Sequence, residues 1–304
     1  MSSADPALAR ADGEVDQGAV NDGPMTVRRR AAVLGSPVSH SLSPALHRAG
    51  YAASGLTGWT YEAIECDADA LPGLVAGRGP EWAGFSVTMP GKAAAAAVAD
   101  LASARVQTLG VANTLVRRDG EWLAENTDVD GIIGSLRAAG ARAPEVALIL
   151  GGGGTAASVV AALAELGTTT LVIAGRRPYS TASSVELGRQ LGIQTNGILW
   201  DDEEIGAFAD TADLVVSTVP AGVADPLADR LSGVPVLFDV VYHPWPTPLA
   251  AAGGPDRVTV TGLDMLLHQA LRQFELMTGL PAPAEAMRRG LREASGTDLP
   301  LPVC

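Results

Sequence analysis

The chain has 304 residues, 47% of them hydrophobic, and a formal net charge of −13. This length predicts about two domains with a sizeable core. The acidic balance, with no basic cluster beyond Arg28-Arg29-Arg30, argues against nucleic-acid and anionic-membrane partners, and no apolar run reaches the roughly 18 residues of a membrane span.

The N-terminal residues and the cysteines indicate the cellular compartment of the protein. Residues 1–27 are rich in Ala, Gly and Asp and contain no apolar signal-peptide core, so we expect a disordered tail there. Cys66 and Cys304 are the only cysteines and lie far apart, which excludes a disulfide framework and a C-x-x-C metal pair. Both features favour a cytoplasmic protein.

Strand and helix patterns alternate through the first half of the chain. A helix is expected after Ser43 as N-cap and Pro44 as first helical residue, and Gly55 ends it. Asp119-Gly120 predicts a type I′ turn between two strands of a hairpin. The strands expected in this half are 30–35, 59–66, 82–88 and the hairpin 112–126.

The pattern starts again near residue 145. An apolar strand is followed by glycines and by a helix that stops at Gly167, and an amphipathic helix is expected over 262–279. This alternation is typical of the α/β class with parallel sheets. The strands expected here are 145–150, 170–175, 212–220, 234–242 and 256–262.

A glycine-rich loop lies between the strand at 145–150 and its helix. Its residues, Gly151, Gly152, Gly153, Gly154, Thr155 and Ala156, match G-x-G-x-x-G/A. Small residues at a helix N-terminus let free N–H groups approach a pyrophosphate, so a dinucleotide site is favoured over a flexible turn.

The end of the next strand indicates which dinucleotide. An NAD site usually has Asp or Glu there to hold the ribose 2′-hydroxyl. This chain has Gly175-Arg176-Arg177 instead, and guanidinium groups suit a 2′-phosphate. We therefore predict NADP(H) as the cofactor, with two solvated surface arginines as the alternative.

Two charged residues follow strand ends in the first half and suggest the chemistry. Lys92 comes just after Gly84-Phe85-Ser86-Val87-Thr88-Met89-Pro90, and Asp128 ends the polar loop after the hairpin. A Lys held by an Asp could exchange a proton with a substrate oxygen. Two unrelated solvated charges are the other interpretation.

Seven segments together resemble the shikimate dehydrogenase family. They are GSPVSHSLSPALH, GFSVTMPGK, GVANTLV, ENTDVDG, GGGGTA, DVVYHPWPTPL and GLDMLLHQA, and they occur in the family's order from about residue 31 to 290. They are most similar to the actinobacterial form.

The resemblance implies a role for each matching residue. Lys92 and Asp128 correspond to the catalytic pair. Ser41, Ser43 and Tyr242 correspond to residues around the substrate carboxylate, and Thr88, Asn113 and Gln269 to those that hold ring hydroxyls. The cofactor is expected to contact Gly151, Gly152, Gly153, Gly154, Thr155, Arg176, Arg177, Thr218, Val240 and Gly262.

Some positions depart from the family pattern, and some polar residues have a structural interpretation. Arg48 stands where Asn is frequent, Gly91 where an aromatic residue is common, and Gly175-Arg176-Arg177 replaces Asn-Arg-Thr. Gln269 lies in the apolar stripe of its helix and could be an ordinary core residue with satisfied hydrogen bonds. The histidines have no metal-ligand spacing, so no metal is predicted.

The predicted fold is α/β with two domains and a cleft between them. Residues 28–128 and 264–295 are expected to form the catalytic domain, and 129–263 a Rossmann-type NADP-binding domain. The resemblance implies reversible NADPH-dependent reduction of 3-dehydroshikimate to shikimate, a step of aromatic amino acid biosynthesis, by a monomer or homodimer. A quinate/shikimate dehydrogenase and a catalytically lapsed NADPH-binding regulatory protein are the alternatives.

Overall fold

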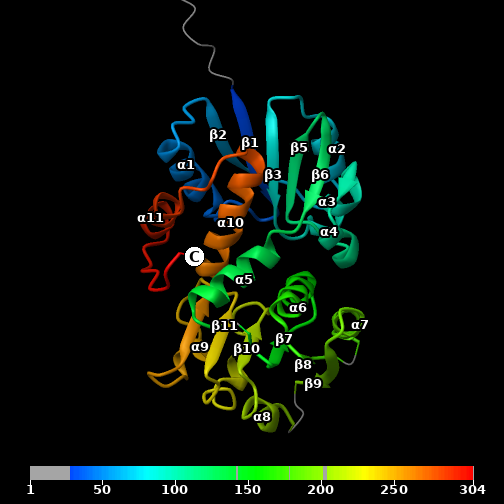
Figure 1. Ribbon diagram of the computed structural model, residues 1–304, viewed down its shortest axis with the longest axis vertical. Coiled ribbons are helices and arrows are strands. Elements are labelled where there is room, and N and C mark those ends of the chain that lie inside the picture. The colour runs from blue at the N-terminus through cyan, green and yellow to red at the C-terminus, as the bar shows by residue number, and fades with distance from the viewer. Residues whose placement is uncertain (1–27, 142, 178, 201–203, 304) are drawn as a thin grey trace, which may run out of the picture.

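The computed structural model describes residues 28–141, 143–177, 179–200 and 204–303. The tail expected at 1–27 lies outside them. Two sheets of six strands form two halves of the molecule, one above the other in Figure 1. The α/β prediction with two domains is therefore confirmed. In the described part of the chain, no helix has both the length and the apolar character needed to cross a bilayer.

The first sheet is mixed rather than parallel throughout. Strands β1, β2 and β3 pair in parallel, whereas β5 runs antiparallel to both β3 and β6. The reversal between β5 and β6 is made by the predicted turn, since Asp119 and Gly120 both have positive φ, 50° and 90°. The order is β2-β1-β3-β5-β6-β4, with β1 Arg29–Gly35, β2 Trp59–Glu65, β3 Trp82–Val87, β4 Leu101–Ala102, β5 Thr114–Arg118 and β6 Glu121–Glu125.

Apolar side chains cover both faces of this sheet. Ala31 and Val33 of β1 belong to one buried cluster, and Ala32 and Leu34 belong to another on the opposite face. Because both faces of the sheet are covered, successive residues of β1 are apolar instead of alternating with polar ones. The helices of this half are α1 Ser43–Ala53, α2 Leu71–Ala76, α3 Lys92–Val98, α4 Ala104–Leu109 and α11 Ala284–Ser295.

The second sheet is parallel throughout, in the order β12-β11-β10-β7-β8-β9. The strand order reverses between β7 and β10, and ligands bind open α/β sheets at such a point. One strand, β9, was missed by the sequence pattern because most of its residues are exposed and half of it is polar. The strands are β7 Val146–Leu150, β8 Thr170–Gly175, β9 Gln194–Leu199, β10 Leu214–Ser217, β11 Val236–Asp239 and β12 Val258–Thr261.

Helices cover the second sheet and link the two halves. The link consists of α5 and α10, which pack against each other beside both sheets (Figure 1). Gly131 and Gly134 allow this close contact, because a Cβ on Gly131 would come within 2.8 Å of the Met265 carbonyl oxygen. The remaining elements are α5 Asp128–Ala138, α6 Gly154–Leu166, α7 Ala182–Gln190, α8 Glu204–Ala209, η1 Asp225–Leu227, α9 Pro248–Ala251 and α10 Gly262–Thr278.

Candidate active site

Loops from several strands meet at one edge of the first sheet. Ser41 and Ser43 follow β1, and Lys92 follows β3. Because β5 is antiparallel to β3 and β6 returns alongside it, Asn113 before β5 and Asp128 after β6 lie at the same edge. The topology therefore gathers side chains that are far apart in the sequence.

The predicted pair of Lys92 and Asp128 is in direct contact. Lys92 Nζ lies 2.5 Å from Asp128 Oδ2, and the two side chains are 16% and 3% exposed. Asp128 is the first residue of α5, where the helix dipole favours a negative charge. Lys92 is also the only lysine of the chain. A buried ion pair at a helix N-terminus thus fixes this ammonium group in place.

Asn113 and Gln269 join the pair. The Asn113 Nδ2 group donates to Asp128 Oδ1 at 2.9 Å and to Gln269 Oε1 at 2.8 Å. Gln269 reaches this point because α10 packs closely on Gly131 of α5. The structure therefore brings four of the predicted site residues into one hydrogen-bonded cluster, and Gln269 has a specific partner.

The serine loop differs from the prediction in one detail. The residue that precedes α1 is Leu42, not Ser43, and the Leu42 side chain makes no cap hydrogen bond. The Ser43 N–H group instead donates to Ser41 Oγ at 3.3 Å. The helix starts one residue earlier than expected because Pro44 fits the first turn at either position. Ser43 is buried, whereas Ser41 is half-buried.

Thr88 lies directly after β3, beside Gly35 at the end of β1. Its backbone N–H group donates to the Leu34 carbonyl at 2.8 Å. A Cβ on Gly35 would come within 2.2 Å of Thr88 Cγ2, so only glycine leaves room for this side chain. The position of Thr88 at the sheet edge therefore depends on Gly35.

Tyr242 and Val240 line a cavity of about 580 Å³ between the two halves, together with His40 and Trp245. Gly262, the first residue of α10, lets this wall form, because its Cβ would come within 2.0 Å of the Val240 carbonyl oxygen. Burial raises the pKa of the Tyr242 hydroxyl, which therefore stays a neutral donor.

The glycine loop brings its backbone close to its neighbours and leaves the start of α6 open. Gly151 has a φ of 104°, and a Cβ on Gly152 would come within 2.2 Å of the Ser180 carbonyl oxygen. Among the described residues nothing lies within 4 Å of a Cβ built on Gly153 or Gly154, and Gly153, the N-cap of α6, has no side chain to cap the helix. The first N–H groups of α6 are therefore free to receive an anion, and the residues fit a dinucleotide.

The other predicted cofactor residues surround this loop at the carboxyl edge of the second sheet. Thr218 follows β10 and donates from Oγ1 to the Leu150 carbonyl at 2.9 Å. Arg176 and Arg177 follow β8 and are exposed, and within the described ranges neither side chain forms an ion pair. Both guanidinium groups are thus available to a phosphate.

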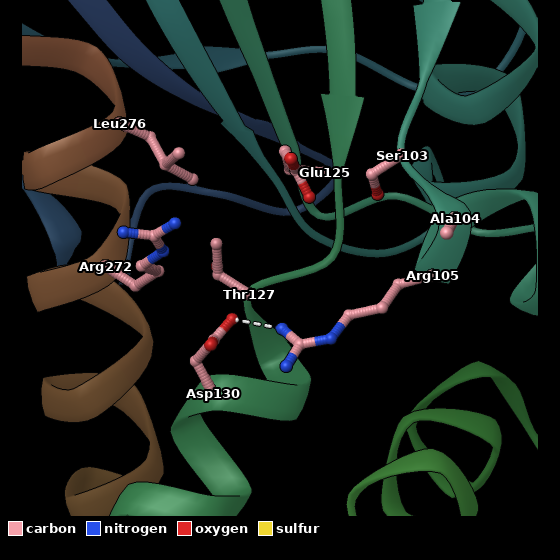
Figure 2. A pocket seen from close by; sticks show the side chains of 8 residues that line it. All are labelled: Ser103, Ala104, Arg105, Glu125, Thr127, Asp130, Arg272 and Leu276. Atoms are coloured by element: carbon pink, nitrogen blue, oxygen red, sulfur yellow. Dashed lines mark hydrogen bonds and ion pairs between the residues drawn. The ribbon is translucent and has the colours of Figure 1, made fainter. Parts of the chain in front are cut away.

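A contact that the sequence did not reveal joins the two halves. Arg105 of α4 binds Glu165 of α6 with two hydrogen bonds of 2.9 Å and donates to Asp130 of α5 at 2.8 Å. Figure 2 shows Arg105 reaching Asp130 across a cavity of about 340 Å³, with Glu125 and Arg272 on its other walls. Only the fold brings Arg105 and Glu165 together, because they are 60 residues apart.

Comparisons with known proteins agree with this architecture. Residues 33–115 match the family model described as "Shikimate dehydrogenase substrate binding domain", and 262–292 match "Shikimate 5'-dehydrogenase C-terminal domain". A protein of Thermosynechococcus vestitus named shikimate dehydrogenase (NADP(+)) is 35% identical over 88% of this chain and 96% of its own. One of the same name from Methylobacterium radiotolerans is 38% identical over 84% of this chain and 92% of its own.

Solved structures give the same result. The Mycobacterium tuberculosis shikimate dehydrogenase superposes with a TM-score of 0.83 and 48% identity, covering 87% of this chain and 99% of its own. The Thermus thermophilus shikimate 5-dehydrogenase in complex with NADP(H) and shikimate superposes with a TM-score of 0.77 and 32% identity. The match covers 88% of this chain and 99% of the Thermus chain.

Proposed function

Because the chain belongs to the shikimate dehydrogenase family, we propose that Lys92 and Asp128 are the catalytic residues of an NADP-dependent reduction of 3-dehydroshikimate to shikimate. The observation that carries this proposal is the position of the only lysine. Apart from Lys92, the permanently basic side chains of the sequence are all arginines, and an arginine cannot release its proton near neutral pH. The one lysine lies 2.5 Å from a buried carboxylate, where its ammonium can exchange a proton with a substrate.

The chain's own residues manage the proton on the substrate oxygen. When bound, NADPH supplies a hydride to the carbonyl carbon. Lys92 Nζ donates the proton that the carbonyl oxygen takes up, and in the reverse direction it accepts the hydroxyl proton. Asp128 holds Nζ in position through its Oδ2 and is itself held by Asn113 at Oδ1. The proton therefore moves at one fixed atom.

The remaining site residues suit a small anionic substrate with several hydroxyls. Such a ligand needs many fixed donors and acceptors, which Asn113, Gln269 and Thr88 provide. We assign Ser41 and Ser43 to the substrate carboxylate, because their hydroxyls lie at the start of α1, where the helix dipole favours an anion. We assign Tyr242 to the same region as a neutral hydrogen-bond donor.

One spectrophotometric comparison tests the proposed function. The purified protein should reduce NADP with shikimate, and it should do so better than with quinate or with NAD. Higher activity with quinate and NAD would favour the quinate/shikimate alternative. NADPH binding without turnover of either substrate would favour the regulatory alternative and refute the assignment of Lys92.

The serines offer a prediction about substrate affinity. Losing one hydrogen bond to a charged carboxylate costs about 1.5–3 kcal/mol, so Ser41→Ala and Ser43→Ala should each raise KM for shikimate roughly 10- to 100-fold. The kcat should change little. Initial-rate kinetics measure both, with Ser39→Ala, an exposed serine of the same loop, as the control. An unchanged KM in both variants would limit the serines to a structural role.

The arginines offer a prediction about the cofactor. The 2′-phosphate is the only difference between NADP and NAD, and Arg176 and Arg177 are exposed, so salt weakens their effect. The double change to alanine should weaken NADP binding roughly 10- to 100-fold and leave NAD nearly unaffected. Fluorescence titration at two salt concentrations measures this, with the exposed Arg230→Ala as control. A double variant with full NADP preference would contradict the assignment.

Several finer proposals follow. We propose residues 28–128 with 264–295 as the catalytic domain and 129–263 as the NADP-binding domain. An actinobacterial type is supported by two Mycobacterium structures at 48% and 49% identity, against 26% for Listeria monocytogenes and 32% for Thermus thermophilus. We also propose a cytoplasmic monomer or homodimer, which cell fractionation and sedimentation would test.

A further inference from the structure

A chain of buried polar side chains lies behind Asn113, inside the catalytic half. Its members are Tyr61 of β2, Ser86 of β3, Thr114 of β5 and Gln273 of α10, each at most 4% exposed. None of them is among the predicted site residues. Polar groups in a core are costly unless they are fully hydrogen-bonded, so a continuous network here requires a reason.

One end of this network has a fixed direction. The Gln273 Oε1 atom can only accept, so Ser86 donates its hydroxyl proton to it, at 2.7 Å. Since that proton is in use, the Tyr61 hydroxyl is the donor in its 2.6 Å contact with Ser86 Oγ. The hydrogen bonds therefore run from Tyr61 through Ser86 to Gln273.

The other end points toward the catalytic pair. Gln273 Nε2 can only donate, and it does so to Thr114 Oγ1 at 3.0 Å. The backbone carbonyl oxygen of Asn113 lies 3.5 Å from Nε2 and also requires a donor there. The proton of Thr114 is thus left for Asn113 Oδ1, at 2.9 Å, which is nearer than the other oxygen within reach, Thr127 Oγ1 at 3.2 Å.

These contacts fix the Asn113 amide. Its Oδ1 accepts from the Thr114 hydroxyl and, at 2.7 Å, from the Thr127 backbone N–H group. Its Nδ2 group then faces Asp128 and Gln269, at 2.9 and 2.8 Å, with Thr127 Oγ1 as a longer contact at 3.0 Å. We propose that Gln273 is a positioning residue for the reaction, which acts through Thr114 to hold the Asn113 amide with its donor toward Asp128 and the substrate. This inference rests on the proposed function.

The physical reason is the direction of the Thr114 proton. If residue 273 could not donate, the Thr114 hydroxyl would be free to turn away from Asn113. Asn113 Oδ1 would keep its contacts with Thr127, from the N–H group at 2.7 Å and the hydroxyl at 3.1 Å, but would lose the Thr114 hydroxyl. A less well positioned donor weakens the hold on Asp128, and small displacements of catalytic groups are costly to the reaction.

The test begins with Thr114. Thr114→Val keeps the shape but removes the hydroxyl, and it should lower kcat/KM for shikimate about tenfold. Thr114→Ser keeps the hydroxyl and should restore kcat/KM to within about twofold of the wild type. The Kd for NADP should not change in either. The control is Thr168→Val, which removes another buried hydroxyl, 2.8 Å from the Pro144 carbonyl and far from the site.

Gln273 itself gives a readout that a purely structural role would not move. In Gln273→Glu, a neutral carboxyl can accept from Ser86 and donate to Thr114 as the amide does, whereas a carboxylate cannot donate. Burial raises the pKa of such a carboxyl, so it stays neutral to a higher pH than an exposed one, and the titratable ring beside it, His47, is uncharged above about pH 4 because burial lowers its pKa. The loss of kcat/KM relative to wild type should therefore grow as the pH rises. In Gln273→Met the loss should be the same at every pH.

The outcomes are distinct. An unchanged kcat/KM in Thr114→Val, or the same pH-independent loss in Gln273→Glu and Gln273→Met, would overturn the inference in an active wild type. If the Gln273 variants do not fold, the Thr114 pair decides alone. A wild type that is inactive with shikimate would refute the proposed function and the inference together.

Discussion

Lys92→Ala should lower kcat by roughly 10²–10⁴-fold, because Lys92 Nζ is the group proposed to donate the proton to the substrate oxygen and to accept it in the reverse direction. The affinity for NADP should stay near that of the wild type, since the glycine loop and Arg176 belong to the other half of the molecule. Steady-state kinetics with shikimate and NADP, together with a cofactor titration, measure both quantities.

Lys92→Arg separates the charge from the proton. An arginine could still pair with Asp128, but its guanidinium group does not release a proton near neutral pH. We therefore expect this variant to fold and to bind NADP, yet to be nearly as inactive as the alanine variant. If Lys92→Arg kept a normal kcat, the ion pair alone would suffice and the proton-transfer role would be wrong.

The single lysine also permits a direct chemical test. Lysine-selective reductive methylation would modify only Lys92 and the terminal amine, because no other lysine exists. The Lys92 side chain is 16% exposed, so the reagent can reach it slowly. Bound shikimate should protect Lys92 and leave the terminal amine reactive. Equal modification with and without shikimate would contradict contact between Lys92 and the substrate.

Local sequence signals predicted those parts of the fold that depend on neighbouring residues. Asp119-Gly120 requires two positive φ angles and forms the expected turn. Gly167 ends α6 in the left-handed region, as expected. The prediction that Ser43 caps α1 was wrong, because the sequence could not distinguish the first from the second helical position for Pro44. Such choices depend on backbone angles that tertiary contacts decide.

Long-range contacts were harder to predict. The positions of Lys92 and Asp128 after strand ends left their contact open, and it was the resemblance to the family that implied the pair. By contrast, no pattern marks Arg105 and Glu165, or the link from Gln273 to Thr114, since these residues are separated by 60 and 159 positions. The motifs therefore indicated which side chains to look for at the candidate site, while the residues that support them became visible only in three dimensions.

Acid should destabilise the fold through two histidines that are buried without charge. Burial lowers the pKa of His47 and of His268 from 6.5 to about 4, and for His47 the neighbouring Gln273 opposes this to a smaller extent. Neither ring nitrogen of His47 has a hydrogen-bond partner in the described chain, and its ring stacks on Tyr61 at 4.2 Å. Both rings must therefore stay neutral in the native state.

The sign follows from the two pKa values. Between pH 6.5 and about 4 the unfolded chain binds a proton at each histidine that the native state refuses, so the free energy of unfolding falls as the pH is lowered. Each pKa unit is worth about 1.4 kcal/mol, so each histidine should cost roughly 3 kcal/mol of stability by the lower end of this range. Asp239 and Asp264, whose pKa values are raised by burial, act in the opposite direction.

Variants isolate the contribution of the histidines from that of the carboxyls. His47→Phe keeps a ring against Tyr61 but cannot titrate, and His268→Leu removes the second group. In urea unfolding at a series of pH values, each variant should lose less stability than the wild type between pH 6.5 and about 4. The exposed His243→Gln should follow the wild-type curve. Parallel curves for wild type, His47→Phe and His268→Leu would show that these rings accept protons in the folded protein, and that burial does not hold them neutral.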